Sequence, residues 1–252
     1  MPNLPDSSDH PSTEDSDITF RSDVTVELVR ASARDADVVF AARVSTVGES
    51  SVEDVDSDAQ RSAGLIRYLM RERHGSPFEH NSMTFLVQAP IFVWREHMRH
   101  RIASYNEESG RYRELRPIFY VPNETRSVVQ DGKPGAYEFH PGTPEQYDVI
   151  DSATRESCAV AYDAHKRLLD AGIAREVARM VLPVTIYSSA YVTMNARALM
   201  NFLSLRKKSD DATYPSYPQR EIEMVAEAYE EHFARLMPIT HEAFVASGRV
   251  AP

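Results

Sequence analysis

A short arginine-rich segment, RHRIASYNEESGRYR (99–113), holds the residue types that bind anions. Guanidinium groups pair with phosphate or carboxylate through two parallel hydrogen bonds, and the neighbouring serines and asparagine add further hydrogen-bonding groups. The whole chain carries a net charge of −10, so this cationic cluster is not a general property of its surface. Two interpretations are open at this point, a solvated surface or an anion-binding site.

The expected direction of the arginines bears on this choice. The sequence predicts a helix over 91–101, and each residue of a helix turns by about 100°. Arg99 and Arg101 would then point to nearly opposite sides. They must serve two different partners, or the helix must end before them. The residues after Ser104 contain few apolar side chains and a glycine, which is typical of a binding loop.

A second arginine cluster lies in AREVARMVLP (174–183). Arg175 and Arg179 are four residues apart, and such a like-charge pair weakens an isolated helix. A bound anion would offset this repulsion. Glu176 or solvent would offset it as well, so the cluster alone does not decide between the two interpretations.

A third cluster lies in NARALMNFLSLR (195–206), where Arg206 continues an apolar stripe that includes Leu203. A guanidinium at the end of a core-facing stripe needs a paired carboxylate or a ligand, because burying the charge alone is costly. Arg197 and Asn201 form a polar stripe on the other side of the same helix. An acidic chain has therefore placed arginines beside polar residues in three separate segments.

Other sites are not supported by the sequence. The nine glycines form neither a G-x-G-x-x-G nor a G-x-x-x-x-G-K-[ST] motif, so neither a dinucleotide-binding Rossmann fold nor a P-loop is predicted. Cys158 is the single cysteine and falls in a helical apolar pattern, which favours a packing role. His97 and His100 have a spacing that metal ligands can have, but no third ligand follows, so no metal site is predicted.

The elements that must position these clusters are mixed helices and strands. No regular βαβ alternation is present, so the sequence favours an α+β fold over a doubly wound parallel sheet. Strands are predicted over 24–29, 82–89, 118–122 and 185–194; helices over 35–45, 57–73, 91–101, 144–170, 174–182, 195–206 and 219–236; and long loops over 123–143 and 207–218.

The totals indicate a globular protein of 252 residues, enough to bury a substantial core. The first twenty residues contain five carboxylates and no Lys or Arg, so 1–20 is predicted to be a disordered acidic tail and 21–252 a single domain. The acidic total argues against a nucleic-acid-binding protein built on the arginine-rich segment. No signal peptide or apolar run of about 20 residues is present, and we expect a cytoplasmic protein without a membrane partner.

At this point the motifs resemble those of a known family. Arg99, His100 and Arg101, followed by seven residues and then Ser109, match the RHR-x7-S signature of the flavin-dependent thymidylate synthases. The surrounding block 73–112 is similar to the central block of that family throughout. The segments 174–183 and 195–206 resemble its two C-terminal blocks, in the same order.

The resemblance implies an α+β fold of mixed helices and antiparallel sheet, the thymidylate synthase-complementing protein fold, assembled as a homotetramer with FAD at subunit interfaces. It also implies conversion of dUMP to dTMP, with methylenetetrahydrofolate as the methylene donor and NADPH as the source of reducing power for FAD. A non-catalytic nucleotide- or flavin-binding module that has lost turnover is the alternative. Such an enzyme needs no attack by a thiolate, and Cys158 lies in none of the matching blocks.

The resemblance also implies roles for individual residues. The expected FAD contacts are Ser76, Arg99, His100, Arg101, Glu107, Asn195, Arg197 and Asn201. The expected dUMP contacts are Glu96, Arg99, Glu107, Glu108, Ser109, Gly110, Arg111, Arg179 and Arg206, while His74 and Glu79 match positions near the flavin and folate. Arg206 is the expected catalytic residue: a guanidinium near the uracil N3 stabilises the ring anion and makes C5 a better nucleophile.

One segment departs from the family pattern. After the position of Arg206, the family has a short Ser-x-His-x-x-x-Glu segment whose histidine approaches the flavin. Here the sequence is KKSDDATYPSYPQREIE (207–223), which is longer and has no histidine. Tyr214, Tyr217 or the backbone would have to take its place.

Overall fold

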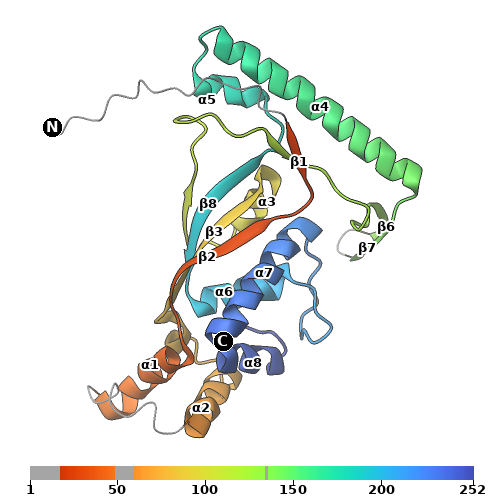
Figure 1. Ribbon diagram of the computed structural model, residues 1–252. Helices are drawn as coiled ribbons and strands as arrows, with labels where there is room; N and C mark the ends of the chain where they lie inside the picture. The colour runs from red at the N-terminus through yellow and green to blue at the C-terminus, as the bar shows by residue number, and fades with distance from the viewer. Residues whose placement is uncertain (1–17, 49–58, 134–135) are drawn as a thin grey trace, which may run out of the picture.

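A four-stranded antiparallel sheet lies at the centre of the protein, whose computed structural model describes residues 18–48, 59–133 and 136–252 (Figure 1). The strand order is β2 (Thr25–Ser32), β3 (Ser82–Pro90), β8 (Tyr187–Met194) and β4 (Ser104–Glu107). Buried and partly exposed side chains alternate along β3, as expected of a strand with one face on the core. The predicted α+β class with an antiparallel sheet is confirmed.

One face of the sheet packs on helices. Phe85 of β3 and its cross-strand partner Val192 of β8 are fully buried on that face. They belong to the same core as residues of α3 (Ile91–His97), α6 (Ala196–Arg206) and α7 (Arg220–Leu236).

The neighbouring pair along the same two strands points to the opposite face. Leu86 and Tyr191 form this pair, in which Leu86 is partly buried and Tyr191 is exposed. This second face of the sheet is therefore less covered within the chain than the first.

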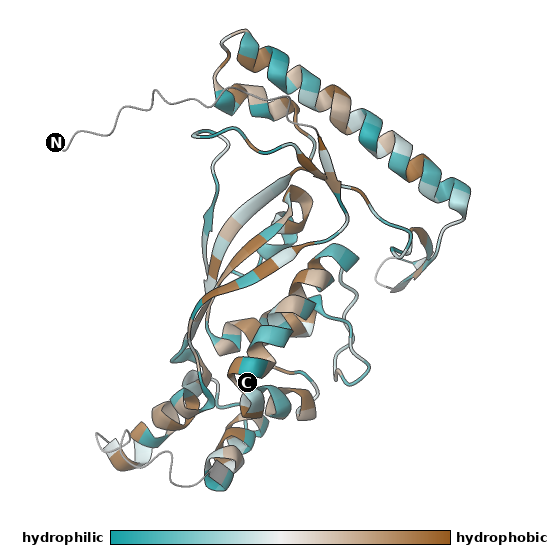
Figure 2. Ribbon diagram, in the orientation of Figure 1, coloured by the Kyte–Doolittle hydropathy of each residue, from teal (hydrophilic) through white to brown (hydrophobic). Residues whose placement is uncertain are grey.

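A smaller apolar cluster lies at the upper end of the sheet in Figure 1. There β1 (Thr19–Arg21) pairs in parallel with β5 (Ile118–Tyr120), and α4 (Pro144–Asp170) packs on the pair. The short helix α5 (Arg175–Ala178) and the 3-10 turn η4 (Arg179–Val181) contact α4. Helix α4 alternates apolar and polar bands along its length (Figure 2), because only one side of it faces this cluster.

Cys158 belongs to the inner side of α4. It is buried, with its Sγ 3.4 Å from the Oγ1 of Thr185. This position confirms the predicted packing role of the cysteine.

The lower end of the molecule is helical. It contains α1 (Asp35–Val47), α2 (Ala59–Arg71), the 3-10 turn η3 (Ser76–Glu79) and α8 (Pro238–Ala246). Asp35 joins two of them, because its carboxylate accepts hydrogen bonds from the backbone N–H groups of Ile239 and Thr240 in the first turn of α8. Within the described residues, no helix is both long enough and apolar enough to cross a membrane.

The most consequential difference from the sequence prediction concerns 91–101, where the helix ends at His97. The hydroxyl of Tyr105 in β4 lies 3.1 Å from the carbonyl oxygen of His97 and 2.9 Å from that of His100. This side chain from another element satisfies carbonyl groups at the end of the helix. Arg99 and Arg101 therefore lie beyond the helix, which was the second of the two possibilities open from the sequence.

Other predicted boundaries need correction. The predicted loop 123–143 contains the hairpin β6 (Val129–Lys133) and β7 (Ala136–His140). The residues after Ser104, expected to form a loop, begin with the edge strand β4, and α8 follows the last predicted helix. The predicted tail 1–20 overlaps β1, because Thr19 and Phe20 belong to that strand; residues 1–17, and the predicted helix start at 57–58, lie outside the described residues.

Candidate active site

Arg206 is held at the C-terminal end of α6 by two side chains from the segment around α3. Its Nη1 donates to the carboxylate of Glu96 at 2.8 Å, and its Nε donates to Nε2 of His100 at 3.1 Å. Within the described residues, its second terminal nitrogen, Nη2, has no hydrogen-bond partner. The sequence predicted that a guanidinium ending this apolar stripe needs a paired carboxylate or a ligand, and the structure supplies the carboxylate, Glu96. The structure thus brings together three residues that were assigned to FAD or dUMP from the sequence.

The two histidines of this segment are uncharged at neutral pH. Burial lowers the pKa of His97 to about 3, and burial together with the charge of Arg206 lowers the pKa of His100 to about 4. A neutral imidazole has one nitrogen that can accept, which is the role that the contact with Arg206 requires of His100.

The two imidazoles point to different partners. Nε2 of His97 lies 3.0 Å from the hydroxyl of Tyr229 in the core, whereas His100 contacts Arg206. The pair is therefore not arranged as two ligands of one metal ion. Within the described ranges, no group of three His, Cys, Asp or Glu side chains could hold a metal.

A compact turn follows β4. The carbonyl oxygen of Ser109 accepts from the backbone N–H of Tyr112 at 3.0 Å, and the Oγ of Ser109 accepts from the backbone N–H of Arg111 at 3.2 Å. Gly110 is buried in this turn against Arg179, whose Cδ would lie 3.2 Å from a Cβ at that position. A larger residue at 110 would therefore press on Arg179.

The turn is also tied to α5. The Nε of Arg111 donates to the carboxylate of Glu176 at 2.8 Å. Together with the contact between Gly110 and Arg179, this ion pair brings the central block and the 174–183 block of the sequence to one place.

Two carboxylates fasten the same turn to β8. Ser188 donates to Glu107 at 2.6 Å, and the backbone N–H of Ser189 donates to Glu108 at 2.9 Å. Both glutamates thus have part of their acceptor capacity used within the chain. Their position fixes where the 109–111 turn begins.

A third group of predicted residues lies near the start of α6. Asn195 caps this helix by accepting from the backbone N–H of Ala198 at 2.9 Å. Arg197, in the first turn, forms an ion pair with Glu79 and lies over Gly75, where a Cβ would be 2.5 Å from the guanidinium carbon. Ser76 follows Gly75 directly and is exposed. Asn201 is also exposed, one turn further along α6.

Four predicted or neighbouring arginines have side chains without a polar partner in the described part of the chain. They are exposed, and among the described residues none of their guanidinium groups has a hydrogen bond or an ion pair: Arg99, Arg101, Arg175 and Arg179. Free guanidinium groups fit the phosphates of dUMP and of FAD, because they offer paired donors without first breaking an internal ion pair. The donor set of the chain therefore fits the two anionic ligands implied by the sequence.

The predicted residues do not form one cluster within the chain. Ser189, which holds the 109–111 turn, lies on β8 (Figure 1). Asn195, which begins the third group, comes six residues later and directly follows the strand. At about 3.3 Å per residue, the two groups are separated by roughly 20 Å. The structure brings together residues within each group but not the groups themselves.

A large cleft extends from the Arg206 group. It has a volume of about 1420 Å³ and lies between α3, the β6–β7 hairpin, the 207–218 loop and the start of α7. Arg95, Tyr137 and Phe139 line it and were not singled out from the sequence. Tyr217, which the sequence offered as a replacement for the missing family histidine, lines it as well. Alternating VQDGK and AYEFH around a Pro-Gly pair is a hairpin signal that could have identified two of them.

The geometry and the sequence agree with one protein family. A family model described as thymidylate synthase complementing protein matches residues 27–239. The chain belongs to this family. Among its relatives, the flavin-dependent thymidylate synthase of Streptomyces coelicolor is 61% identical over 240 residues, which cover 95% of this chain and 98% of the relative. The flavin-dependent thymidylate synthase of Tropheryma whipplei is 60% identical over 236 residues, covering 94% of this chain and 98% of the relative.

Solved structures agree with these relatives. The UMP/dUMP methylase PolB from Streptomyces cacaoi, bound with 5-Br dUMP, is 59% identical with a TM-score of 0.89, covering 93% of this chain and all of that chain. The same protein bound with 5-Br UMP gives 58% identity and a TM-score of 0.87, covering 93% of this chain and 99% of that chain.

Proposed function

We propose that this chain is a flavin-dependent thymidylate synthase that converts dUMP to dTMP, with methylenetetrahydrofolate as methylene donor and NADPH as reductant of FAD. The observation that carries the proposal is the contact of Arg206 with both Glu96 and His100, which joins the two sequence blocks expected to hold substrate and cofactor. The names of the close relatives support the same reaction.

Arg206 is the residue through which the chain activates the pyrimidine. Glu96 and neutral His100 hold its Nη1 and Nε, so Nη2 is the donor left for the substrate. Directed at the uracil N3, this charge stabilises the deprotonated ring and increases the electron density at C5, the carbon that must accept the methylene. Glu96 keeps the guanidinium oriented without taking its last donor.

The group of residues around the 109–111 turn binds the phosphate of dUMP. Among the described residues, the Arg179 guanidinium has no hydrogen-bond or ion-pair partner, and Gly110 lies close enough to its side chain to restrict where the guanidinium can go. Arg111 is held by Glu176 and contributes to the shape of the turn.

Two sets of residues bind the flavin. One set is near the start of α6 and consists of Ser76, Asn195, Arg197 and Asn201; the other is the RHR motif (99–101). When bound, FAD supplies the hydride that completes the methyl group. Arg99 and Arg101 provide free donors for its anionic part, and the close contact of Gly75 with Arg197 fixes the direction of a third guanidinium.

We further propose that the site is completed between subunits of a homotetramer. The two outer groups are roughly 20 Å apart along β8 in one chain. The segments that carry the free arginines also expose large apolar side chains: Tyr112 is 80% exposed, Met180 77% and Ile102 73%. Exposed apolar groups beside a binding site are typical of a surface that another protein covers.

The tetramer predicts a particle of about 114 kDa, from four chains of 28.5 kDa, in light scattering of the FAD-bound protein. Because a ligand that binds only the assembled state stabilises it, removal of FAD should weaken the assembly. Arg179→Ala and Arg197→Ala damage opposite ends of the site, so mixing the two inactive variants should partly restore activity. An active, FAD-loaded monomer would contradict this assembly.

The visible absorption spectrum of the purified protein tests the reaction itself. We expect a yellow protein whose flavin band bleaches when NADPH is added without oxygen and returns with oxygen. With dUMP and methylenetetrahydrofolate present, dTMP should accumulate. A colourless protein that still binds dUMP would instead favour the non-catalytic module.

A further inference from the structure

The segment Gly248–Pro252 contacts Arg197 at the start of α6 and the 207–218 loop beyond the end of that helix. The carbonyl oxygen of Pro252 accepts from the Nε of Arg197 at 2.6 Å. Arg249 reaches in the other direction and pairs with Glu230 of α7, while the carbonyl oxygen of Gly248 accepts from the backbone N–H of Thr213 in the 207–218 loop at 2.9 Å. Five consecutive residues thus contact the first turn of α6 and the loop that follows it.

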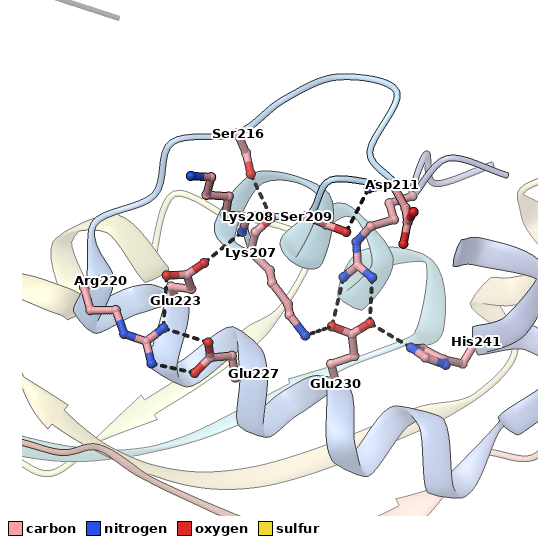
Figure 3. Close-up of polar contacts among 11 residues, drawn as sticks. Lys207, Lys208, Ser209, Asp211, Ser216, Arg220, Glu223, Glu227, Glu230 and His241 are labelled. Atoms are coloured by element: carbon pink, nitrogen blue, oxygen red, sulfur yellow. Dashed lines mark hydrogen bonds and ion pairs between the residues drawn. The ribbon is translucent and has the colours of Figure 1, made fainter. Parts of the chain in front are cut away.

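Glu230 is the centre of a buried charged cluster (Figure 3). Its two oxygens accept from the two terminal nitrogens of Arg249 at 2.8 and 2.9 Å, from Nζ of Lys207 at 2.6 Å and from Nε2 of His241 at 2.7 Å. Glu230 and Arg249 are each 6% exposed. Charge-assisted hydrogen bonds of this kind fix the donors in place more firmly than neutral ones.

Lys207 connects the charged cluster around Glu230 to Arg206 of the proposed active site. It follows Arg206 directly and ends α6, and its backbone N–H donates to the carbonyl oxygen of Leu203 at 3.1 Å. Its own carbonyl oxygen accepts from Ser216 at 2.8 Å (Figure 3). Lys207 is held at both its backbone and its ammonium group. The cluster around Glu230 therefore fixes the position of the C-terminal end of α6, where Arg206 is the last residue.

We propose that Gly248–Pro252 is a strap that positions Arg206 through Arg249, Glu230 and Lys207, and positions Arg197 through the Pro252 carbonyl oxygen. This inference rests on the proposed function, in which Arg206 serves dUMP and Arg197 serves FAD. Glu230, Arg249 and Lys207 are positioning residues in this scheme, since none of them is assigned to a ligand. The first arm of the strap is the series of contacts from Arg249 through Glu230 to Lys207, and the second arm is the contact of Pro252 with Arg197. The strap differs from a simple packing element because each arm affects a different ligand.

The first arm is tested by Lys207→Met, which keeps the length of the side chain and leaves Glu230 paired with Arg249 and His241. We expect turnover and dUMP affinity to fall about tenfold, because a small displacement of a catalytic group is costly, while FAD affinity stays within about twofold. Lys207→Arg should restore both. Lys166→Met on α4 is the matched control, because it removes a lysine far from the strap.

The second arm is tested by ending the chain at Val250, which removes the Pro252 carbonyl oxygen. FAD affinity should fall about tenfold, since a hydrogen bond to a charged group is lost, while dUMP affinity stays within about twofold. Pro252→Ala keeps the carbonyl and should bind FAD normally. If the shortened chain does not fold, insertion of one glycine between Val250 and Ala251 displaces the same carbonyl and retains both buried residues.

Titrations of FAD and of dUMP, together with melting temperatures, separate the outcomes. A crossed pattern, with dUMP lost in one variant and FAD in the other, supports the strap. Parallel loss of both ligands in proportion to melting temperature, or no loss in either variant, overturns it. A wild-type protein that binds neither ligand would instead contradict the proposed function.

Discussion

Replacement of Arg206 by alanine is expected to lower kcat by about 10²- to 10³-fold while the fold and the bound FAD are retained. The side chain lies at the end of α6, and its polar contacts among the described residues are those with Glu96 and His100. Removing it leaves the apolar stripe of the helix intact. An interaction made chiefly in the transition state affects turnover more than binding, so KM for dUMP should change less than kcat.

Arg206→Lys and Arg167→Ala provide the comparison. Lysine keeps the charge but cannot bind Glu96, His100 and the substrate with three fixed nitrogens, so activity should be intermediate. Arg167 lies on α4, where it pairs with Asp163 at the surface, and its loss should leave kcat unchanged. Steady-state kinetics and flavin absorption of the three variants are the measurements. Normal turnover in Arg206→Ala would remove the catalytic role from this residue.

Replacement of Glu230 by glutamine is expected to lower the free energy of unfolding by about 3–5 kcal/mol. Breaking a buried ion pair on one side leaves the remaining charges buried without compensation, here those of Arg249 and Lys207. Urea denaturation monitored by circular dichroism measures the loss. Glu231→Gln is the matched control, because Glu231, the next residue on α7, is exposed and its replacement should change stability little.

The pH dependence of this difference provides a second check. Burial raises the pKa of Glu230, but hydrogen bonds from His241, Arg249 and Lys207 outweigh it and hold the pKa well below the ordinary value of 4.5. A carboxylate with a lowered pKa stabilises the folded state fully above its unfolded pKa and loses that contribution as the pH falls. The difference between wild type and Glu230→Gln should therefore be constant at neutral pH and narrow below about pH 4.5. A difference that widened in acid would contradict the assignment.

The sequence predicted most elements because their signals are local. Helix α4 was predicted over 144–170, where it is found. Its ends depend on neighbouring residues alone: in the structure Thr143 and Gln146 form a capping box at its start, and Gly172 follows its end. The end of α3 was missed because its cause is remote: the hydroxyl of Tyr105 contacts the carbonyl oxygen of His97 only when β4 pairs with β8.

The same distinction applies to the site. The apolar stripe on α6 predicted that Arg206 would need a paired carboxylate or a ligand, but the choice of Glu96 depends on how the segment around α3 packs beside α6. The resemblance to a family named both residues and no local pattern paired them. The cluster of Lys207, Glu230 and Arg249 had no signal in the sequence, because its members come from three elements that meet only in the folded protein.

Strand β8 determines where insertions and deletions can be tolerated. Ser188 and Ser189 near its beginning hold Glu107 and Glu108, and Asn195 follows its last residue. A single inserted residue would exchange the two faces of the strand and also change the distance between the two ends of the site. The chain can therefore vary in length around the β6–β7 hairpin, a separate two-stranded sheet, far more readily than within β8. In an evolving gene, the length of β8 should therefore stay constant while the hairpin gains or loses residues.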